Sequence, residues 1–491
     1  MIALAPTPVW LIAAPLLLAF ASPLWGRLRM PLLFGAYAAL FALALSFFPA
    51  VAVGPLLETI VIAPPLGIHL HVDSVSLLLV ALFNFAGGVV ALFLWLGGGS
   101  EHLRGRGAFV LLLLLIAGCN GMILTGDLFN LYVFLEITGV SAYVLSALRQ
   151  DGAALEAGLK FLIIGSVAAV FFLFAVVLIY LQTGSLNMAA VAATFGTTAA
   201  PLQLLIVLLM LVGLGIKAEL FPFNFWVPDI YRGSDPAAAS LFSGVVVKAF
   251  LFVLFHLVFL ILADPALVQT WLMALGATTM LIAEWTALRQ RDMRRMLAYS
   301  SLGQIGLIAM ALGFGTTTVT AGALFHMVNH TLIKLLLFLI AALILQRLGT
   351  ARIDKLAGMA RQMPVAAGLF VLGSLAVLGL PPTNGFISKF WILEGLAAEQ
   401  VFWPIAVILL AAMLEAGYYF RWIAVFYRTE APAAAPIGTA NPLVHLPLLV
   451  LGALILVLGI APFLIDGQFV DAARDLLGRA ATLQAVLGVQ P

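Results

Sequence analysis

Apolar segments of about 20 residues follow one another along nearly the whole chain, separated by short breaks that contain polar residues, glycine or proline. A helix needs about 20 apolar residues to cross a bilayer, whereas a barrel strand needs about ten and alternates in polarity. Hydrophobic residues fill 64% of the 491 positions and charged residues 9%, against roughly 25% charged residues in soluble proteins. The sequence therefore predicts an all-α polytopic membrane protein that lies in the lipid bilayer.

Charge and cysteine content exclude other classes. A net charge of +2 gives no indication of a nucleic-acid partner, and the single cysteine, Cys119, cannot form a disulfide within the chain. The first apolar segment follows an uncharged start, so we interpret it as a first span rather than as a cleaved signal peptide.

The positions of lysine and arginine predict the topology. Fourteen spans are expected, at about residues 6–25, 30–49, 74–97, 108–125, 127–148, 158–181, 201–231, 236–262, 265–288, 298–313, 317–346, 364–398, 402–427 and 444–464. Of the 23 basic residues, 17 lie in or beside odd-numbered connections. The positive-inside rule then places both termini on the outer, periplasmic side of a bacterial inner membrane. Arg474 and Arg479 fall in residues 469–486, which we expect to form an amphipathic surface helix.

Two spans contain internal proline motifs. The seventh contains Pro222 shortly after Lys217, and the twelfth contains Pro381 and Pro382 shortly before Lys389. Proline removes a backbone donor, so both helices are expected to break inside the membrane. The breaks are five spans apart, which predicts two five-helix repeats of inverted topology, spans 4–8 and 9–13. The predicted divisions are residues 1–107, 108–262, 263–428 and 429–491.

Four lysines lie inside predicted spans, where each costs at least about 2.5 kcal/mol unless it has a partner or water. If the spans are centred on the bilayer, several ionisable residues share one depth, and Lys334 and Lys389 lie a turn or two away. This arrangement favours a lateral proton relay over a vertical pore. The residues at the common depth are Glu136, Lys217, Lys248, His330 and Glu415.

Several of the acidic residues in or near this row also have a simpler interpretation. Glu136 and a lysine can exchange a proton or form only a structural ion pair. Glu219 follows Lys217 and either modulates it or faces away. Glu415 is a modulator of the row or only a packing partner. Asp127, near the outer end of the fifth span, and His256, in the eighth, are two further possible modulators.

His326, His330 and Lys334 are spaced to lie on one side of a helix. A zinc site is disfavoured because no further ligands accompany the histidines. A haem site is disfavoured because only His256 offers a ligand from another span, so we expect no metal and no cofactor. A proton shuttle fits better, because histidine titrates near neutral pH; hydrogen-bonded packing histidines are the alternative.

Other ionisable residues receive ordinary interpretations. Glu284 is expected to form a surface ion pair with Arg289 and Arg291 at a helix end. Four further histidines are expected in loops or interfaces without any cluster: His69, His71, His102 and His445.

Several motifs in order resemble the antiporter-like proton-translocating subunits shared by Mrp-type antiporters, respiratory complex I and energy-converting hydrogenases. The matching stretches are residues 72–76 (VDSVS), 126–136 (GDLFNLYVFLE), 215–229 (GIKAELFPFNFWVPD), 298–306 (AYSSLGQIG), 326–334 (HMVNHTLIK) and 379–389 (GLPPTNGFISK). The resemblance covers almost the whole chain, and residues 126–136 are most similar to the D-type component of Mrp antiporters. Glu219 departs from the small residue expected beside the lysine.

The resemblance implies fourteen helices, with helices 7 and 12 broken. It also implies that Glu136 pairs with Lys217, that Lys248 and the histidines relay protons, and that Lys389 is the terminal carrier. We therefore expect a transporter subunit rather than an enzyme, part of a multisubunit Na⁺/proton antiporter with other membrane subunits as partners. The alternatives are a proton-pumping subunit of a redox-driven complex and a purely scaffolding subunit.

Overall fold

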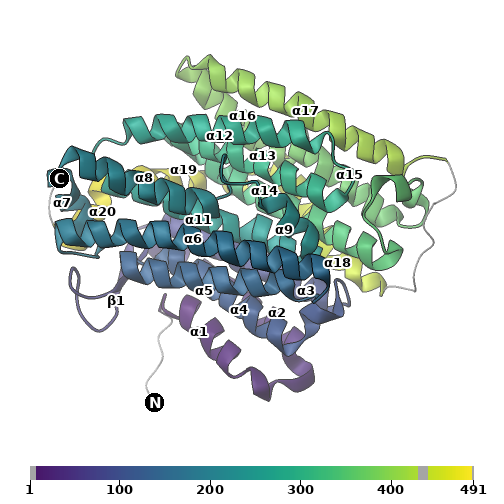
Figure 1. Ribbon diagram of the computed structural model, residues 1–491, viewed down its shortest axis with the longest axis horizontal. Coiled ribbons are helices and arrows are strands. Elements are labelled where there is room, and N and C mark those ends of the chain that lie inside the picture. The colour runs from purple at the N-terminus through teal and green to yellow at the C-terminus, as the bar shows by residue number, and fades with distance from the viewer. Residues whose placement is uncertain (1–6, 430–440, 489–491) are drawn as a thin grey trace.

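The computed structural model describes residues 7–429 and 441–488, and nearly all of the regular structure is helical (Figure 1). In the first half of the chain the helices are α1 (Trp10–Phe20), α2 (Arg29–Val51), α3 (Ser74–Trp95), α4 (Arg106–Leu124), α5 (Leu128–Ala147), α6 (Gly152–Thr183), α7 (Met188–Thr194), α8 (Ala200–Lys217), α9 (Val227–Gly233), α10 (Pro236–Leu241) and α11 (Val247–Ile261). An antiparallel hairpin of β1 (Leu56–Thr59) and β2 (His69–Val72) joins α2 to α3.

The second half continues with α12 (Ala266–Ala287), α13 (Met293–Phe314), α14 (Thr317–Leu348), α15 (Pro364–Leu378), α16 (Asn384–Ala398), α17 (Phe402–Phe426), α18 (Leu446–Ile460), α19 (Asp466–Leu477) and α20 (Arg479–Leu487). Within the described residues, twelve helices are long and apolar enough to cross a membrane, and α1 and α15 are shorter apolar helices. The predicted all-α polytopic fold is confirmed. The start of the first predicted span, residue 6, lies outside the described residues.

Both predicted helix breaks are present. The seventh span stops at Lys217 and resumes as α9 at Val227, and the twelfth stops at Leu378 and resumes as α16 at Asn384. The eighth span differs from a regular helix, because a π-helical segment, Phe242–Val246, joins α10 to α11. Such segments leave the usual hydrogen-bond ladder irregular and often accompany functional residues. Apolar periodicity gives no sign of it.

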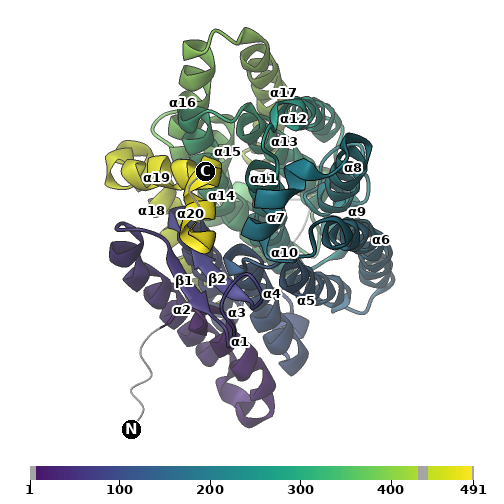
Figure 2. The same cartoon turned by 90° about the vertical axis from the view of Figure 1, so that its left-hand side faces the viewer.

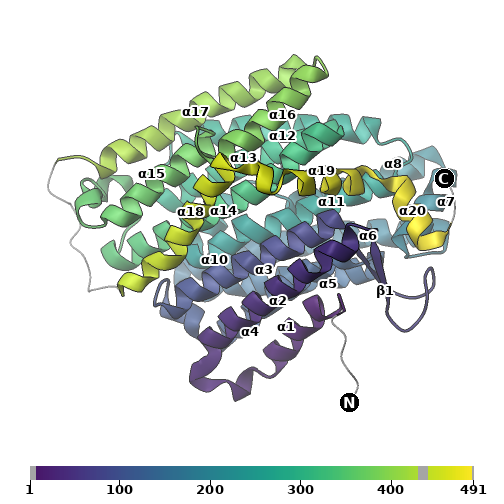
Figure 3. The same cartoon turned by 180° about the vertical axis from the view of Figure 1, so that it is seen from behind.

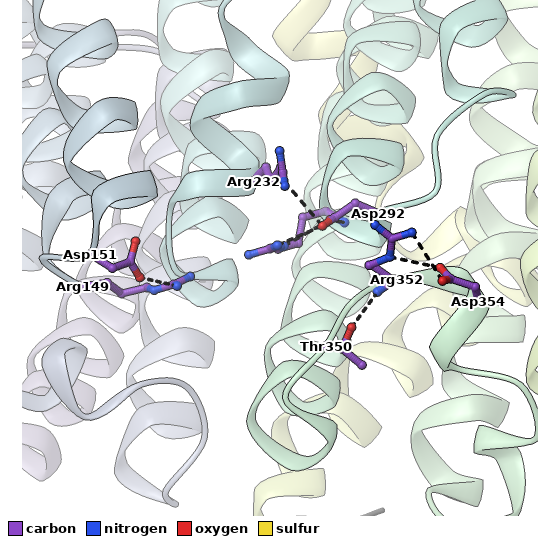
Figure 4. Close-up of polar contacts among 8 residues, drawn as sticks. Arg149, Asp151, Arg232, Asp292, Thr350, Arg352 and Asp354 are labelled. Atoms are coloured by element: carbon purple, nitrogen blue, oxygen red, sulfur yellow. Dashed lines mark hydrogen bonds and ion pairs between the residues drawn. The ribbon is translucent and has the colours of Figure 1, made fainter. Parts of the chain in front are cut away.

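The two ends of the helical body differ in composition. At one end, ion pairs lie between and within the loops: Arg232 pairs with Asp292 of another connection at 3.7 Å, and Arg352 pairs with Asp354 of its own loop at 3.2 Å (Figure 4). The opposite end carries the β-hairpin, α7 and α20 (Figures 1 and 2). The basic loops therefore gather at one end of the molecule, as the topology requires.

The structure of residues 469–486 differs from the single surface helix that the sequence predicts. The segment forms two helices, and α19 packs against α3 and α14 (Figure 3). Phe469 is fully buried and stacks on Phe325, with 4.6 Å between ring centroids. One face of α19 is apolar because it covers the helical body, so amphipathicity alone did not reveal its location.

Helices α12 and α13 approach closely at two glycines. A Cβ atom added to Gly306 would lie 2.5 Å from the carbonyl oxygen of Gly276 and from the amide nitrogen of Met280. Because backbone atoms cannot move aside as a side chain can, Gly306→Ala should force the helices apart and destabilise the fold by roughly 1–3 kcal/mol. The measurement is thermal unfolding in detergent.

The matched control is Gly368→Ala in α15, where an added Cβ would meet no atom within 4 Å. It should leave the unfolding midpoint unchanged or raise it slightly, because alanine favours helix. Equal midpoints for the two variants would contradict the close packing of α12 on α13.

Candidate functional site

The first buried pair joins α5 to the break after α8. Lys217 is the last residue of α8, and its Nζ lies 3.6 Å from Oε1 of Glu136 and 3.1 Å from the Tyr143 hydroxyl. The lysine is 6% exposed, whereas the side chain of Glu136 is 31% exposed at the edge of the chain. The predicted pairing of these two residues is present.

Glu219 lies in the turn that follows α8, where its φ of 61° is in the left-handed region. Its Oε1 accepts a hydrogen bond from the Tyr231 hydroxyl at 2.7 Å, and its charge acts on Lys248. Glu219 and Lys217 also line one cavity of about 10 Å³. Glu219 therefore lies between the first and second buried lysines, rather than forming an ion pair with Lys217.

The second lysine sits beside the π-helical segment. Lys248 is fully buried, and its Nζ donates to the carbonyl oxygen of Ser243 within that segment. Nδ1 of His330 lies 2.5 Å from the same Nζ, while the His330 Nε2 has no hydrogen-bond partner among the described residues. The irregular backbone thus holds Lys248 against α14.

The polar residues of α14 contact three neighbouring elements. Nε2 of His326 lies 2.9 Å from Oε1 of Gln304 in α13, and its Nδ1 lies 2.9 Å from Oγ of Ser388 in α16. Lys334 donates to Oγ of Ser300 in α13 at 2.7 Å. His330 contacts Lys248 of α11. The polar side chains along α14 therefore contact helices from both halves of the chain.

The last lysine of the row follows the second helix break. Lys389 donates to Oε2 of Glu415 at 3.1 Å and to the carbonyl oxygen of Val377 at 2.6 Å. The second oxygen of Glu415 accepts from Nε2 of Gln304 at 2.7 Å. Gln304 thereby joins His326 to Glu415. Its role was not predicted from the sequence, because an uncharged amide inside an apolar span carries no charge that would require a partner.

The sequence interpretation of Glu284 is wrong. This residue is fully buried, and its Oε2 accepts a hydrogen bond from the Tyr418 hydroxyl at 2.8 Å. Helix α12 continues to Ala287, so Glu284 points inward against α13, where the absence of a side chain on Gly303 makes room for its carboxyl group. A Cβ on Gly303 would lie 1.7 Å from Oε1 of Glu284.

The expectation that His69 and His71 belong to no cluster is also wrong. The β-hairpin folds back against the helix ends, so Nε2 of His71 lies 3.5 Å from Oδ2 of Asp73 and Nδ1 of His69 lies 3.3 Å from Nδ2 of Asn187. His69, His71, Asp73 and His256 line a cavity of about 20 Å³. Asp127 caps α5 nearby, its Oδ1 accepting from the amide of Asn130 at 2.8 Å.

The hairpin histidines differ from a metal site in their arrangement. In the part of the chain that the structure describes, no group of three or more His, Cys, Asp or Glu side chains is arranged to hold a metal ion. His256 instead stacks on Phe252, with 5.2 Å between ring centroids.

His69 makes stability depend on pH. Burial, and then the neighbouring His71, lower the pKa of His69 to about 4, while Asp73 keeps a pKa of about 2 because the hydrogen bond and charge of His71 outweigh its burial. A histidine that stays neutral in the fold loses stability as pH falls below its unfolded pKa of about 6.5, by roughly 3 kcal/mol at pH 4. His69→Gln should remove this dependence.

The measurement is the thermal midpoint of the wild-type chain and of His69→Gln across this pH range. The wild-type midpoint should fall relative to that of the variant as pH decreases from about 6.5 to 4. A difference between the two midpoints that stays constant with pH would contradict the assignment.

Known proteins resemble this chain over most of its length. The profile of a family described as "NADH:quinone oxidoreductase/Mrp antiporter, TM" matches residues 125–415. The N-type component of NADH-quinone oxidoreductase from Desulforudis audaxviator is 36% identical over 92% of this chain and 95% of its own. The D-type component of the Na⁺/H⁺ antiporter from Alkalihalophilus pseudofirmus is 31% identical over 86% of each chain.

Two solved structures are also similar. A chain of the membrane-bound sulfane sulfur reductase, an archaeal respiratory membrane complex, gives a TM-score of 0.91 at 33% identity and covers 98% of this chain and 100% of its own. A chain of the Mrp complex from Dietzia sp. gives a TM-score of 0.90 at 24% identity, covering 99% of this chain and 100% of its own. The latter likeness concerns the fold alone.

Proposed function

The chain belongs to the NADH:quinone oxidoreductase/Mrp antiporter transmembrane family, and from that premise we propose that protons pass sideways along its buried row, from Glu136 to Lys389. It is an antiporter-like, proton-translocating membrane subunit. The proposal depends on a series of direct contacts between ionisable or polar side chains in a region of apolar helices. They join Glu136 to Lys217, Lys248 to His330, His326 to Gln304, Gln304 to Glu415 and Glu415 to Lys389.

The first step is the exchange between Glu136 and Lys217. An ammonium group in an apolar region keeps its proton only while a nearby negative charge stabilises it. Protonation or displacement of Glu136 therefore favours proton release from Lys217. The partial exposure of Glu136 at the edge of the chain gives it access to a group outside this chain.

The second step crosses from Lys217 to Lys248. The cavity that Lys217 and Glu219 line is about large enough for one water molecule, which needs at least ~10 Å³. Glu219 acts electrostatically on Lys248 from the other side. We propose that a water molecule here passes the proton and that the Glu219 carboxylate stabilises charge on Lys248.

The third step uses the two nitrogens of each imidazole ring. His330 accepts a proton from Lys248 on Nδ1 and can release a proton from Nε2 on the opposite side of the ring, so the proton moves across the imidazole in one direction. His326 lies one helical turn away and contacts Gln304. We propose that Gln304 holds His326 and Glu415 in position while water passes the proton between them. Glu415 and Lys389 then close the row beside the broken α15–α16 span.

We propose that the complex containing this chain exchanges protons for Na⁺ and is an Mrp-type antiporter. Support comes from the 31% identity to the D-type component of a Na⁺/H⁺ antiporter over most of both chains. A lysine at position 389, at the end of the row, also suits this type of subunit.

A redox-driven complex is the second candidate. The relative from NADH-quinone oxidoreductase is 36% identical, and the sulfane sulfur reductase chain is 33% identical over nearly the full length. In that setting the redox cofactors would belong to partner chains, and the same proton row would be driven by electron transfer.

We propose that a partner subunit covers α5. Glu136 lies within a stripe of exposed residues on this helix that includes Val133 and Val140. A carboxylate facing hydrocarbon costs several kcal/mol, about 2.5–3.5 on insertion scales. A partner with a polar group at this depth would remove that cost and continue the row beyond this chain.

Purification of the assembled complex from its native membrane tests the choice between the two candidates. The antiporter proposal predicts hydrophobic partners without redox cofactors, and a Na⁺ gradient that drives proton flux in reconstituted vesicles. Partners that carry iron–sulfur clusters, with flux that requires an electron donor instead, would overturn it in favour of the second candidate.

We also propose that the end with the basic loops faces the cytoplasm, so that both termini lie outside. Ala263 and Lys355 are exposed at opposite ends, and the native Cys119 is buried. In right-side-out vesicles an impermeant thiol reagent should label Ala263→Cys but not Lys355→Cys. The reverse labelling would invert the assignment.

A further inference from the structure

A fully buried carboxyl group lies beside the proposed row without belonging to it. Glu284 accepts the Tyr418 hydroxyl on one oxygen, while its other oxygen, Oε1, has no hydrogen-bond partner among the described residues. An ionised carboxylate with an unsatisfied oxygen is costly in an apolar interior, which favours a group that binds and releases a proton.

Polar side chains lie between Glu284 and Lys334, which follows His330 of the row by one helical turn on α14. Lys334 donates to Oγ of Ser300 at 2.7 Å, and the Tyr418 hydroxyl donates to Oε2 of Glu284 at 2.8 Å. Between these two bonds, the Tyr418 ring packs on the Tyr419 ring, with 4.7 Å between centroids. Ser300 also lies 2.9 Å from the Tyr419 hydroxyl. The bonds at the two ends of this series point the same way, from the lysine toward the carboxylate, as proton transfer to Glu284 requires.

Charged groups from three helices act on Glu284. They are Glu415 of α17, Lys334 of α14 and Lys389 of α16. Glu284 therefore responds electrostatically to the proton occupancy of the last part of the row. It also lies one turn before the end of α12, on the side of the basic loops, where Arg421 donates to the carbonyl oxygen of Leu288 at 2.6 Å.

We propose that Glu284 is a proton-holding residue of this subunit, which takes a proton from Lys334 through Ser300 and Tyr418. In the transfer the ammonium group of Lys334 gives one proton to Ser300, Ser300 gives its own to Tyr418, and Tyr418 gives its own to Glu284. A buried ion pair thereby becomes a neutral amine and a neutral carboxylic acid, and the net charge of the site is unchanged. The branch leads away from the row toward the basic-loop end.

This inference depends on the proposed function, because a proton must reach Lys334 before it can branch. A structural role for Glu284 is the competing interpretation, in which the Tyr418 hydroxyl only holds α17 against α12. The two interpretations differ for Glu284→Gln, which keeps an acceptor oxygen for Tyr418 but cannot take up a proton. Glu394→Gln, an exposed residue of α16, is the matched control.

The experiment measures proton flux with a pH-sensitive dye in vesicles containing the complete complex, together with infrared titration of the carboxylic acid band. Glu284→Gln should assemble normally, lower the flux at least tenfold and lose one titrating band, whereas Glu394→Gln should keep wild-type flux. Tyr418→Phe should lower the flux similarly while it retains the band. If Glu284→Gln does not assemble, Tyr418→Phe alone decides.

Wild-type flux in Glu284→Gln, or in an assembled Tyr418→Phe when Glu284→Gln cannot be made, would overturn the inference. Lys217→Ala, tested in the same vesicles, distinguishes failure of the branch from failure of the row. If it abolishes flux while the Glu284 and Tyr418 variants do not, only the branch fails. If none of these variants changes flux, the proposed row fails as well.

Discussion

Replacing Lys217 by alanine is expected to abolish proton flux through the assembled complex. Lys217 is the last residue of α8, and its Nζ lies 3.6 Å from Oε1 of Glu136. It is the proton carrier that the first step of the row requires. A positioned proton-transfer group contributes roughly 10²–10⁴-fold to a rate, so the residual flux should be near background. The measurement is dye-reported flux in vesicles.

Glu136→Gln should reduce flux to a similar extent, because its amide cannot stabilise or release the lysine proton. Lys217→Arg is an informative control: it keeps the positive charge but does not give up a proton at accessible pH. It should restore assembly where alanine weakens it, without restoring flux. Full flux in Lys217→Arg would show that the charge matters and its titration does not.

Lys248→Met is the second substitution with a large expected effect. Lys248 bridges the π-helical segment and α14 through Ser243 and His330, so its loss should interrupt the row between the two halves of the chain. Methionine matches the length of the lysine stem, which favours correct packing in a site that is fully buried. Flux should fall by roughly 10² or more while the complex assembles.

The control for this position is His256→Gln, which lies on the same helix but outside the row. It should leave flux unchanged within a factor of about two, because His256 contacts the hairpin cluster and not Lys248. Wild-type flux in Lys248→Met would mean that the short contact with His330 is only structural.

The overall fold follows from the sequence, because lipid leaves few alternatives for apolar segments about 20 residues long. The positions of the breaks after Lys217 and before Lys389 were predictable from Pro222, Pro381 and Pro382, whose chemistry is local. The π-helical segment was not predictable, because it depends on how α10 and the segment itself pack against α14.

The candidate site was only partly predictable for a related reason. Sequence gives depth along a helix but not the direction in which a side chain points. Glu136 and Lys217 were found because both are charged and lie at mid-span. Glu284 was misjudged because two arginines follow it in the chain, and only the close approach of α13 at Gly303 turns it inward.

The hairpin cluster illustrates the same limit. His69 and His71 lie in a connection that sequence treats as an exposed loop, yet β2 folds back so that His69 is 1% exposed and contacts Asn187. Contacts between residues separated by more than a hundred positions depend on tertiary packing. No local pattern contains them.

The most direct test of lateral proton transfer is flux through the assembled complex that carries Lys389→Ala. Lys389 lies at the far end of the row from Glu136, paired with Glu415, so a proton that moves sideways through the whole subunit must use it. Lateral transfer predicts flux at background level, with normal assembly. Wild-type flux in this variant, alongside loss of flux in Lys217→Ala, would show that protons cross within the first half of the chain and would contradict the lateral row.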